Sequence, residues 1–329
     1  MEYKAIKLLK RPQNEITADI FETVTLQTPA LEKDQFLVKQ THMSLDPAMR
    51  TWMDDNDDSY VEPVAVGDVM RSFGVGEIVE SKNDNYPVGS RVLGMTGWAE
   101  YVLGGDDMQI VPLELPVEAL LCVMYVPGLT AYLGLMEIAR PKAGETLVVS
   151  GAAGSVGSLA GQIGKAEGLR VIGIAGSDEK CEWLEQELGF DKAINYKTAD
   201  LEAEISAAAP HGVDVYFENT GGPVQQVVFN HMNRFGRIAV CGMISDYNRE
   251  EPAPGPSWKQ INLKALRVEG FVILDHYDKI PQMTEALGGY LAKGQLKYRI
   301  HKLHGLDSAI DGVNLLFSGN NKGKLVVEL

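Results

Sequence analysis

A loop of small residues at 150–157, SGAAGSVG, has the residue types and spacing of a phosphate-binding turn. It follows an apolar run and opens a helical pattern, so Gly154 would let the backbone approach a pyrophosphate and Gly157 would allow tight helix packing. The strict G-x-G-x-x-G motif is broken at Ala152, which leaves a plain turn of small residues as the alternative. The flanking strand and helix N-terminus favour a dinucleotide site. Its predicted contacts are Gly154, Ser155, Val156 and Gly157.

The segment IAGSDEK, at 174–180, lies where a dinucleotide-binding protein selects its cofactor. An acid at the end of the second strand would accept hydrogen bonds from the ribose hydroxyls, but this strand ends in Ala175 and Gly176. The acids at 178 and 179 are interpreted as first-turn residues that complement a helix dipole. Lys180 could turn back to a 2′-phosphate and Ser177 could add a hydroxyl. On residue type alone, a solvated surface lysine is the favoured interpretation.

No metal site is predicted. The three cysteines are far apart and form no Cys-x-x-Cys pair, and His301 and His304 have helical spacing in a strand-like segment. The acidic run at 54–58 departs from a calcium loop at its sixth and twelfth positions, Ser59 and Ala65. Polarisation of a substrate oxygen would therefore fall to a hydroxyl donor. Tyr247 follows the fifth strand of the alternating region, although a surface aromatic in a Pro-rich loop is its alternative reading.

Two kinds of region must position these residues. The first 120 residues consist of short extended segments cut by Gly and Pro, which is typical of a small β-rich domain. From about residue 132, apolar strands alternate with amphipathic helices, and this alternation predicts an α/β fold with a doubly wound parallel sheet. After a helix at about 281–293 we expect short β-like pieces, and a final strand in KGKLVVEL that rejoins the first domain.

Composition narrows the function classes. With 45 acids and 30 bases among 329 residues, the net charge of −15 repels nucleic acid and anionic lipid. No apolar run was found that approaches the roughly 20 residues of a membrane span, so no membrane association is predicted. The N-terminal segment lacks the pattern of a secretory signal, and a cytoplasmic location is the expectation.

Several segments together resemble one family: VPGLTAYLGL, AAGSVGSLAGQIGK, GSDEKCEWL, INYKT, FENTGG, FGRIAVCGMISDYN and NNKGKLVVEL. They are similar to the medium-chain dehydrogenase/reductase superfamily, and within it to the zinc-free leukotriene/prostaglandin reductases, plant double-bond reductases and bacterial curcumin reductases. The resemblance implies a GroES-like β-barrel catalytic domain at 1–125, completed by 298–329. It also implies a Rossmann NADP(H)-binding domain at 126–297, and a homodimer.

The resemblance also implies residue roles. Lys180 and Tyr196 would clamp the 2′-phosphate of NADP(H). Tyr247 would be the first catalytic residue, beside the substrate carbonyl, and Tyr60 a second, as in the curcumin reductase branch. Whether Arg50 contacts substrate or only supports the domain interface stays open. The nicotinamide half would contact Asn219, Cys241, Gly242, Met243, Phe271, Val272, Ile273 and Asn321, with ordinary strand packing as the alternative for Phe271 and Val272.

The implied activity is zinc-independent, NADPH-dependent reduction of the carbon–carbon double bond of small-molecule α,β-unsaturated ketones or aldehydes. Hydride would reach the β-carbon and leave an enolate for a hydroxyl to stabilise or protonate. An NADPH quinone oxidoreductase and a non-catalytic NADPH-binding protein of the crystallin or sensor kind are the alternatives. Substrate identity cannot be read from the irregular segments 43–62 and 244–260 that we expect to line the cleft.

Overall fold

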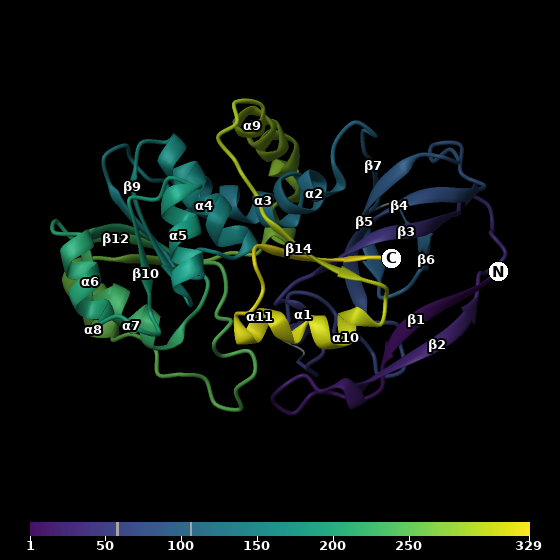
Figure 1. The fold of residues 1–329 in the computed structure, drawn as a ribbon, viewed down its shortest axis with the longest axis horizontal. Helices are drawn as coiled ribbons and strands as arrows, with labels where there is room; N and C mark the ends of the chain where they lie inside the picture. Colours follow the sequence, from purple (N-terminus) through teal and green to yellow (C-terminus); the bar gives the residue numbers. More distant parts are fainter. Residues whose placement is uncertain (57–58, 106) are drawn as a thin grey trace. The chain divides into compact units, whose positions relative to one another are not determined.

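The computed structural model describes residues 1–56, 59–105 and 107–329, which form two compact units. The first unit comprises 1–121 and 300–329, and the second comprises 122–299. The sequence predicts the same two-unit division, with the boundaries between the units after residues 125 and 297. Figure 1 shows strands in both termini of the chain, and both belong to the first unit.

The first unit is built mainly of antiparallel strands, although β14 and β15 pair in parallel. A two-stranded sheet pairs β1 with β2, and the described residues also form a seven-stranded sheet in the order β14-β15-β3-β4-β5-β7, with β6 on β3. The expected final strand is confirmed, since β15 lies antiparallel to β3 with Leu325 opposite Leu45. Strand bounds are β1 Glu2–Leu8, β2 Phe21–Gln27, β3 Phe36–Leu45, β4 Arg71–Ser81, β5 Arg91–Gly97, β6 Tyr101–Gly104, β7 Gln109–Ile110, β14 Ile300–His304 and β15 Lys324–Glu328.

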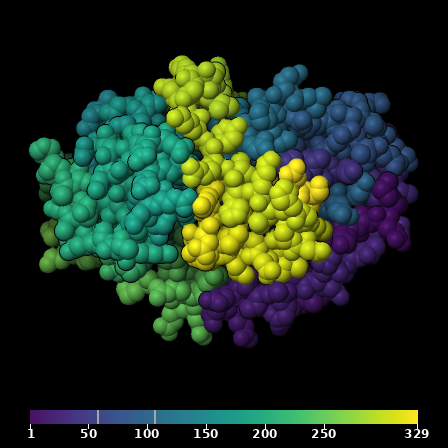
Figure 2. Space-filling view, in the orientation of Figure 1, coloured from purple at the N-terminus to yellow at the C-terminus, as the bar shows by residue number. Residues whose placement is uncertain are grey.

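The first unit also contains short helices: η1 Ala18–Ile20, α1 Met49–Trp52, α10 Ser308–Gly312 and α11 Asn314–Ser318. The expectation of only β-like pieces near the C-terminus was wrong for α10 and α11, which lie at the surface on the face shown in Figure 2. Each has five residues, too few for a helical period to stand out in a sequence.

The second unit contains a six-stranded parallel sheet in the order β10-β9-β8-β11-β12-β13. From β8 the chain adds β9 and β10 on one side of the sheet, and from β11 it adds β12 and β13 on the other side. The strand order therefore reverses between the neighbours β8 and β11, as in a dinucleotide-binding sheet. All four residues of β8 are buried, as expected for a strand covered on both faces. Strand bounds are β8 Thr146–Val149, β9 Arg170–Ala175, β10 Lys192–Asn195, β11 Val213–Glu218, β12 Met232–Val240 and β13 Arg267–Gly270.

Helices connect these strands, and the alternation predicted from the sequence is confirmed. Val148, Ile172, Tyr216 and Phe229 are among the side chains that fill the core between sheet and helices. The sequence did not predict α8. Helix bounds are α4 Ser155–Ala166, α5 Asp178–Gln186, α6 Leu201–Ala208, α7 Gly222–His231, α8 Trp258–Lys264, η4 Ile273–Lys279 and α9 Ile280–Ala292.

Residues 117–139 form a further helical segment: α2 Val117–Ala119, η2 Leu120–Met124, α3 Val126–Tyr132 and η3 Leu133–Ala139. By length and mean hydropathy (1.8) this 23-residue segment could cross a membrane, so the expectation that no apolar run approaches that length was wrong. However, 67% of its apolar window is buried within the protein, and the cap residue Tyr125 has extended backbone. A buried core helix meets the same length and hydropathy criteria, so the segment is weak evidence for a membrane span.

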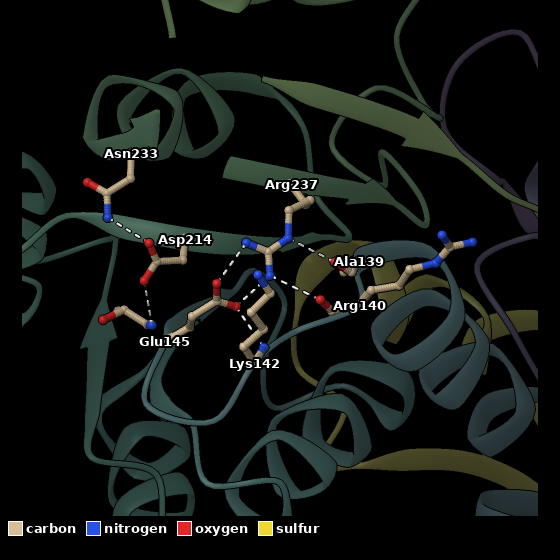
Figure 3. Close-up of polar contacts among 8 residues, drawn as sticks. Ala139, Arg140, Lys142, Glu145, Asp214, Asn233 and Arg237 are labelled. Atoms are coloured by element: carbon tan, nitrogen blue, oxygen red, sulfur yellow. Dashed lines mark hydrogen bonds and ion pairs between the residues drawn. The ribbon is translucent and has the colours of Figure 1, made fainter. Parts of the chain in front are cut away.

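The amino-terminal edge of the parallel sheet is held by a polar network (Figure 3). The Arg237 guanidinium donates to the Glu145 carboxylate at 3.0 Å and to the carbonyls of Ala139 and Arg140 at 3.0 and 3.1 Å. Nearby, the Asp214 carboxylate accepts from the Asn233 amide at 2.8 Å. These bonds tie the start of β8 to η3 and β12, at the opposite edge of the sheet from the predicted site.

Candidate functional site

The loop between β8 and α4 has the shape of a phosphate cradle. Gly151 has φ of +58°, a left-handed conformation that favours glycine, and turns the chain out of β8. A Cβ on Gly157 would lie 2.4 Å from the Gly151 carbonyl oxygen, so only glycine allows α4 to start this close to the loop. Gly154 is the N-cap of α4, and no side chain among the described residues caps it. The helix amides that follow, at Ser155 and Val156, therefore point to an edge suited to an anion.

The next corner of the sheet gathers the residues predicted to bind a 2′-phosphate. The Ser177 hydroxyl is the N-cap of α5 and accepts from the Lys180 backbone N–H at 3.3 Å. A Cβ on Gly176 would lie 3.3 Å from the Tyr196 ring and 3.4 Å from Cε of Lys197. Ser177 and Tyr196 thus lie at the carboxyl ends of β9 and β10, with Lys180 in the first turn of α5. Lys197 lies at the same corner and was not predicted from the sequence.

The Asp178 carboxylate binds a side chain of the neighbouring strand β10. Asp178 lies in the first turn of α5 and accepts from the Asn195 side chain at 2.7 Å. This agrees with its interpretation as a helix-start residue, because an acid bonded to the neighbouring strand is drawn away from a ribose.

The turn after β12 holds the predicted catalytic phenol. The Met243 N–H donates to Oη of Tyr247 at 3.3 Å, and a Cβ on Gly242 would lie 3.0 Å from that oxygen. The absence of a side chain at Gly242 therefore lets the phenol lie over the turn. Burial first, and the Glu218 carboxylate second, raise the pKa of the Cys241 thiol to about 12, so it is protonated at neutral pH.

Asn219 links the turn that follows β11 to the turn that follows β8. Its backbone N–H donates to Oγ of Ser150 at 2.8 Å, and its side-chain amide donates to the Ser150 carbonyl at 2.7 Å. The structure thus brings the turns after β8, β11 and β12 to one edge of the sheet, where the sequence analysis expected the dinucleotide.

The segment after β13 contributes mainly packing. The Phe271 ring lies edge-on to Phe217, with centroids 6.2 Å apart, and a Cβ on Gly134 would lie 2.3 Å from it. These contacts favour the packing interpretation for the Phe271 side chain. Val272 has extended backbone and precedes helix η4, and the buried Ile273 is the first residue of that helix.

The remaining predicted residues belong to the first unit. Asn321 is buried, with its side-chain amide donating to the Gly323 carbonyl at 2.9 Å. Tyr60 is 47% exposed. Arg50 is only 4% exposed; its Nε donates to the Asn14 carbonyl at 3.2 Å and its guanidinium pairs with Asp54. These bonds give Arg50 a supporting role within this unit.

Within the described ranges, no group of three or more His, Cys, Asp or Glu side chains is arranged to hold a metal ion. His301 and His304 lie on strand β14, as the sequence suggested, and Asp54 of the acidic run pairs with Arg50. Asp57 and Asp58 of that run lie outside the described residues.

Comparison with known proteins decides the family. Residues 4–113 match the model described as the N-terminal domain of oxidoreductase, and residues 155–288 match the model described as zinc-binding dehydrogenase. The NADP(+)-dependent 2-alkenal reductase of Nicotiana tabacum is 40% identical, covering 93% of this chain and 90% of its own. Prostaglandin reductase 1 of Bos taurus is 39% identical, covering 94% and 93%. This chain belongs to the medium-chain dehydrogenase/reductase superfamily, in the branch of the prostaglandin and alkenal reductases.

A solved structure from the same reductase branch shares the fold. The CurA protein of Vibrio vulnificus, crystallised in complex with NADPH, is 38% identical with a TM-score of 0.94, covering 99% of this chain and 98% of its own. The GroES-like and Rossmann architecture expected from the sequence is therefore confirmed.

Within this reductase, the sequence analysis overlooked residues that shape the site. No role was predicted for Gly151, because the first glycine position of the motif was assigned to residue 152, which is alanine. No role was predicted for Ser150 or Glu218. A carboxylate at the end of the segment VDVYFE is costly to bury without partners and could have drawn attention to Glu218.

Proposed function

We propose that this protein reduces the carbon–carbon double bond of α,β-unsaturated ketones or aldehydes with NADPH. The observation that carries the proposal is the Tyr247 phenol over the Cys241–Met243 turn, in a chain about as similar to an alkenal reductase as to a prostaglandin reductase. A phenol at the carboxyl edge of a dinucleotide-binding sheet suits the polarisation of a carbonyl oxygen.

The residues present fit NADP(H). Glycines 154 and 157 leave room for the diphosphate over the start of α4, where the helix dipole is positive. Ser177, Lys180 and Tyr196 would hold the 2′-phosphate, and Asn219 and the Cys241–Met243 turn the nicotinamide half. When bound, the reduced nicotinamide supplies the hydride that the substrate β-carbon receives.

The chain itself would handle the charge that develops on the substrate oxygen. The Met243 N–H, donating to Oη, orients the Tyr247 phenol, which in turn would donate to the substrate carbonyl. After hydride addition at the β-carbon, Tyr247 would protonate the enolate oxygen, the enol would tautomerise to the saturated ketone or aldehyde, and solvent would reprotonate Tyr247. Tyr60 is assigned as a second hydroxyl donor on the substrate side. No step requires a metal, which agrees with the scattered cysteines.

We further propose a cytoplasmic homodimer with no nucleic acid or membrane partner. Strand β13 ends the parallel sheet, and Val268 on it is 40% exposed. Beside it in sequence, Trp258 and Leu263 on α8 are 84% and 60% exposed. An open strand edge with exposed apolar side chains is suited to pairing with a second copy.

The activity is tested with purified protein, NADPH or NADH, and a panel of 3-nonen-2-one, 2-nonenal, a prostanoid ketone and a quinone. We expect NADPH consumption by the enone and the enal, with the saturated carbonyl compound as product by mass spectrometry. Turnover with the quinone alone would replace the proposal by a quinone oxidoreductase. NADPH binding without turnover of any substrate would indicate a non-catalytic binding protein.

A further inference from the structure

Glu218, the last residue of β11, is a fully buried carboxylate at the centre of the predicted cofactor edge. Its Oε1 accepts from the Ser150 hydroxyl at 2.6 Å and from the backbone N–H groups of Thr220 and Gly221 at 2.7 and 3.1 Å. The Thr220 hydroxyl lies 3.3 Å from the same oxygen. Oε2 accepts from the Tyr216 hydroxyl at 2.6 Å.

The backbone of Glu218 extends these contacts to a third turn. Its carbonyl accepts from the N–H groups of Cys241 and Gly242 at 2.8 and 3.2 Å. One residue therefore binds the turns that follow β8, β11 and β12. Those turns carry Asn219, the phosphate loop and the Gly242 position over which Tyr247 lies.

The two carboxylate oxygens have different tasks. Among the described residues, Oε2 bonds within its own strand, to Tyr216, whose pKa is raised well above its usual value by burial, by the Glu218 charge and by this bond. Tyr216 is therefore a donor. Oε1 receives the groups that belong to the turns, and Ser150, which donates to it, also accepts the Asn219 N–H. The charge thus orients a hydroxyl that in turn positions Asn219.

Burial of a carboxylate is costly unless its lone pairs have donors, and the donors to Oε1 of Glu218 come from the turns that follow β8 and β11. We propose that Glu218 is a positioning residue for the dinucleotide: its Oε1 sets the turn that carries Asn219 and the adjoining phosphate loop. This inference rests on the proposed function in that it assumes NADPH as the ligand of these turns.

The test compares Glu218→Gln with Tyr216→Phe. In Glu218→Gln the charge is lost. With the amide oxygen at the Oε1 position, the NH₂ faces the Tyr216 hydroxyl, which can turn to accept, so the bonds to the turns remain but lose their charge assistance and weaken. Tyr216→Phe removes a hydrogen bond from the same carboxylate but leaves Oε1 and its turn contacts in place. It is therefore a matched control for general loosening of the core.

Two readouts are used. We expect the Kd for NADPH, from quenching of intrinsic fluorescence, to rise about tenfold or more in Glu218→Gln and to stay within about twofold in Tyr216→Phe, as expected for loss of charge-assisted bonds. Amide hydrogen exchange in the cofactor-free protein should accelerate at 219–221 and 241–242 in Glu218→Gln only. If Glu218→Gln does not fold, Ser150→Ala takes its place with the same expectation.

A folded Glu218→Gln protein with unchanged Kd and unchanged exchange would overturn the inference. Equal increases of Kd in both variants would also overturn it, since they would indicate general loosening. Because neither readout needs a substrate, a wild-type protein that binds NADPH but reduces no double bond would refute the proposed function and leave this inference to be judged separately.

Discussion

At the scale of single residues, we propose that a lysine is the charged group that selects between NADPH and NADH. Asp178, which could have suggested NAD, is bonded to Asn195, whereas Lys180 lies in the first turn of the same helix and its N–H donates to the Ser177 cap. Lys197 approaches the same corner from the turn after β10, with Cε 3.4 Å from the position of a Gly176 Cβ. A 2′-phosphate between them would meet cations from two elements.

We expect Lys180→Ala and Lys197→Ala each to raise the KM for NADPH about tenfold and to leave the KM for NADH unchanged, because only NADPH carries the 2′-phosphate. Steady-state kinetics with both cofactors measure this. Lys192→Ala is the control, since Lys192 on β10 pairs with Glu204 at 3.4 Å instead. An unchanged KM for NADPH in Lys180→Ala would refute its phosphate role.

Tyr247→Phe tests the proton donor. We expect kcat for enone reduction to fall about 100-fold, the usual range for removing a placed acid, while the Kd for NADPH changes less than about twofold. Rapid mixing with and without substrate separates the two quantities. If kcat is unaffected, the donor is another group, with Tyr60 the next residue to substitute.

At the scale of elements, the site depends on how closely α4 starts behind β8. This approach is set by Gly157, since any larger residue would overlap the Gly151 carbonyl. Helix α4 is apolar on the side that packs on the sheet, so it cannot slide away without exposing buried side chains such as Leu159 and Ile163.

Gly157→Ala should therefore displace the first turn of α4 and weaken NADPH binding by about tenfold or more, with a modest loss of stability. Gly289→Ala on α9 is the matched control, because its Cβ would meet no atom within 4 Å. In that helix the change should stabilise by about 0.5–1 kcal/mol and leave binding unchanged. Isothermal calorimetry and thermal unfolding report the two effects; equal Kd values for both variants would contradict this account.

At the scale of the whole molecule, the polar network of Arg237 and Glu145 and the residues proposed to bind the cofactor lie at opposite edges of the parallel sheet. Burial raises the pKa of Glu145, but the bonds from Arg237 and the Lys142 backbone outweigh it, and the pKa lies below its usual value of 4.5. A carboxyl with a lowered pKa contributes stability that is present above the usual pKa and lost as the pH falls through the lowered one.

Arg237→Met should lower the unfolding free energy by roughly 2–3 kcal/mol at neutral pH, or about 5–10 °C in Tm, because it leaves the Glu145 carboxylate without its partner. The deficit should shrink as the pH falls below 4.5, where Glu145 becomes protonated. Thermal unfolding between neutral and acidic pH measures this. NADPH binding at low temperature should be unchanged, and a pH-independent deficit would argue against the ion pair.

The proposed homodimer is tested by size-exclusion chromatography with light scattering. We expect a mass near twice the chain mass of 35.9 kDa for the wild type, and the monomer mass after Val268→Lys. Val88→Lys is the control, since Val88 is 61% exposed in the other unit. A wild-type protein with the mass of one chain would refute the dimer.

Much of this protein was determined by local sequence pattern. The alternation of strands and helices predicted the parallel sheet, and the glycines at 154 and 157 predicted the loop, because strand periodicity, helix periodicity and glycine geometry are local properties. The same approach missed α10, α11 and the buried segment 117–139. Short helices show no full period, and a helix that is apolar on every side shows no polar face.

Only the tertiary structure decided how distant residues combine. Ser150 and Glu218 are 68 positions apart, yet their side chains meet at 2.6 Å because β8 and β11 are neighbours in the sheet. Likewise, Tyr196 and Lys197 reach Gly176 because β10 lies parallel to β9. Strand order is set by the burial of the whole sheet between its helices, a cooperative property that no single segment encodes. The sequence therefore determined which groups are present, and the fold determined which of them meet.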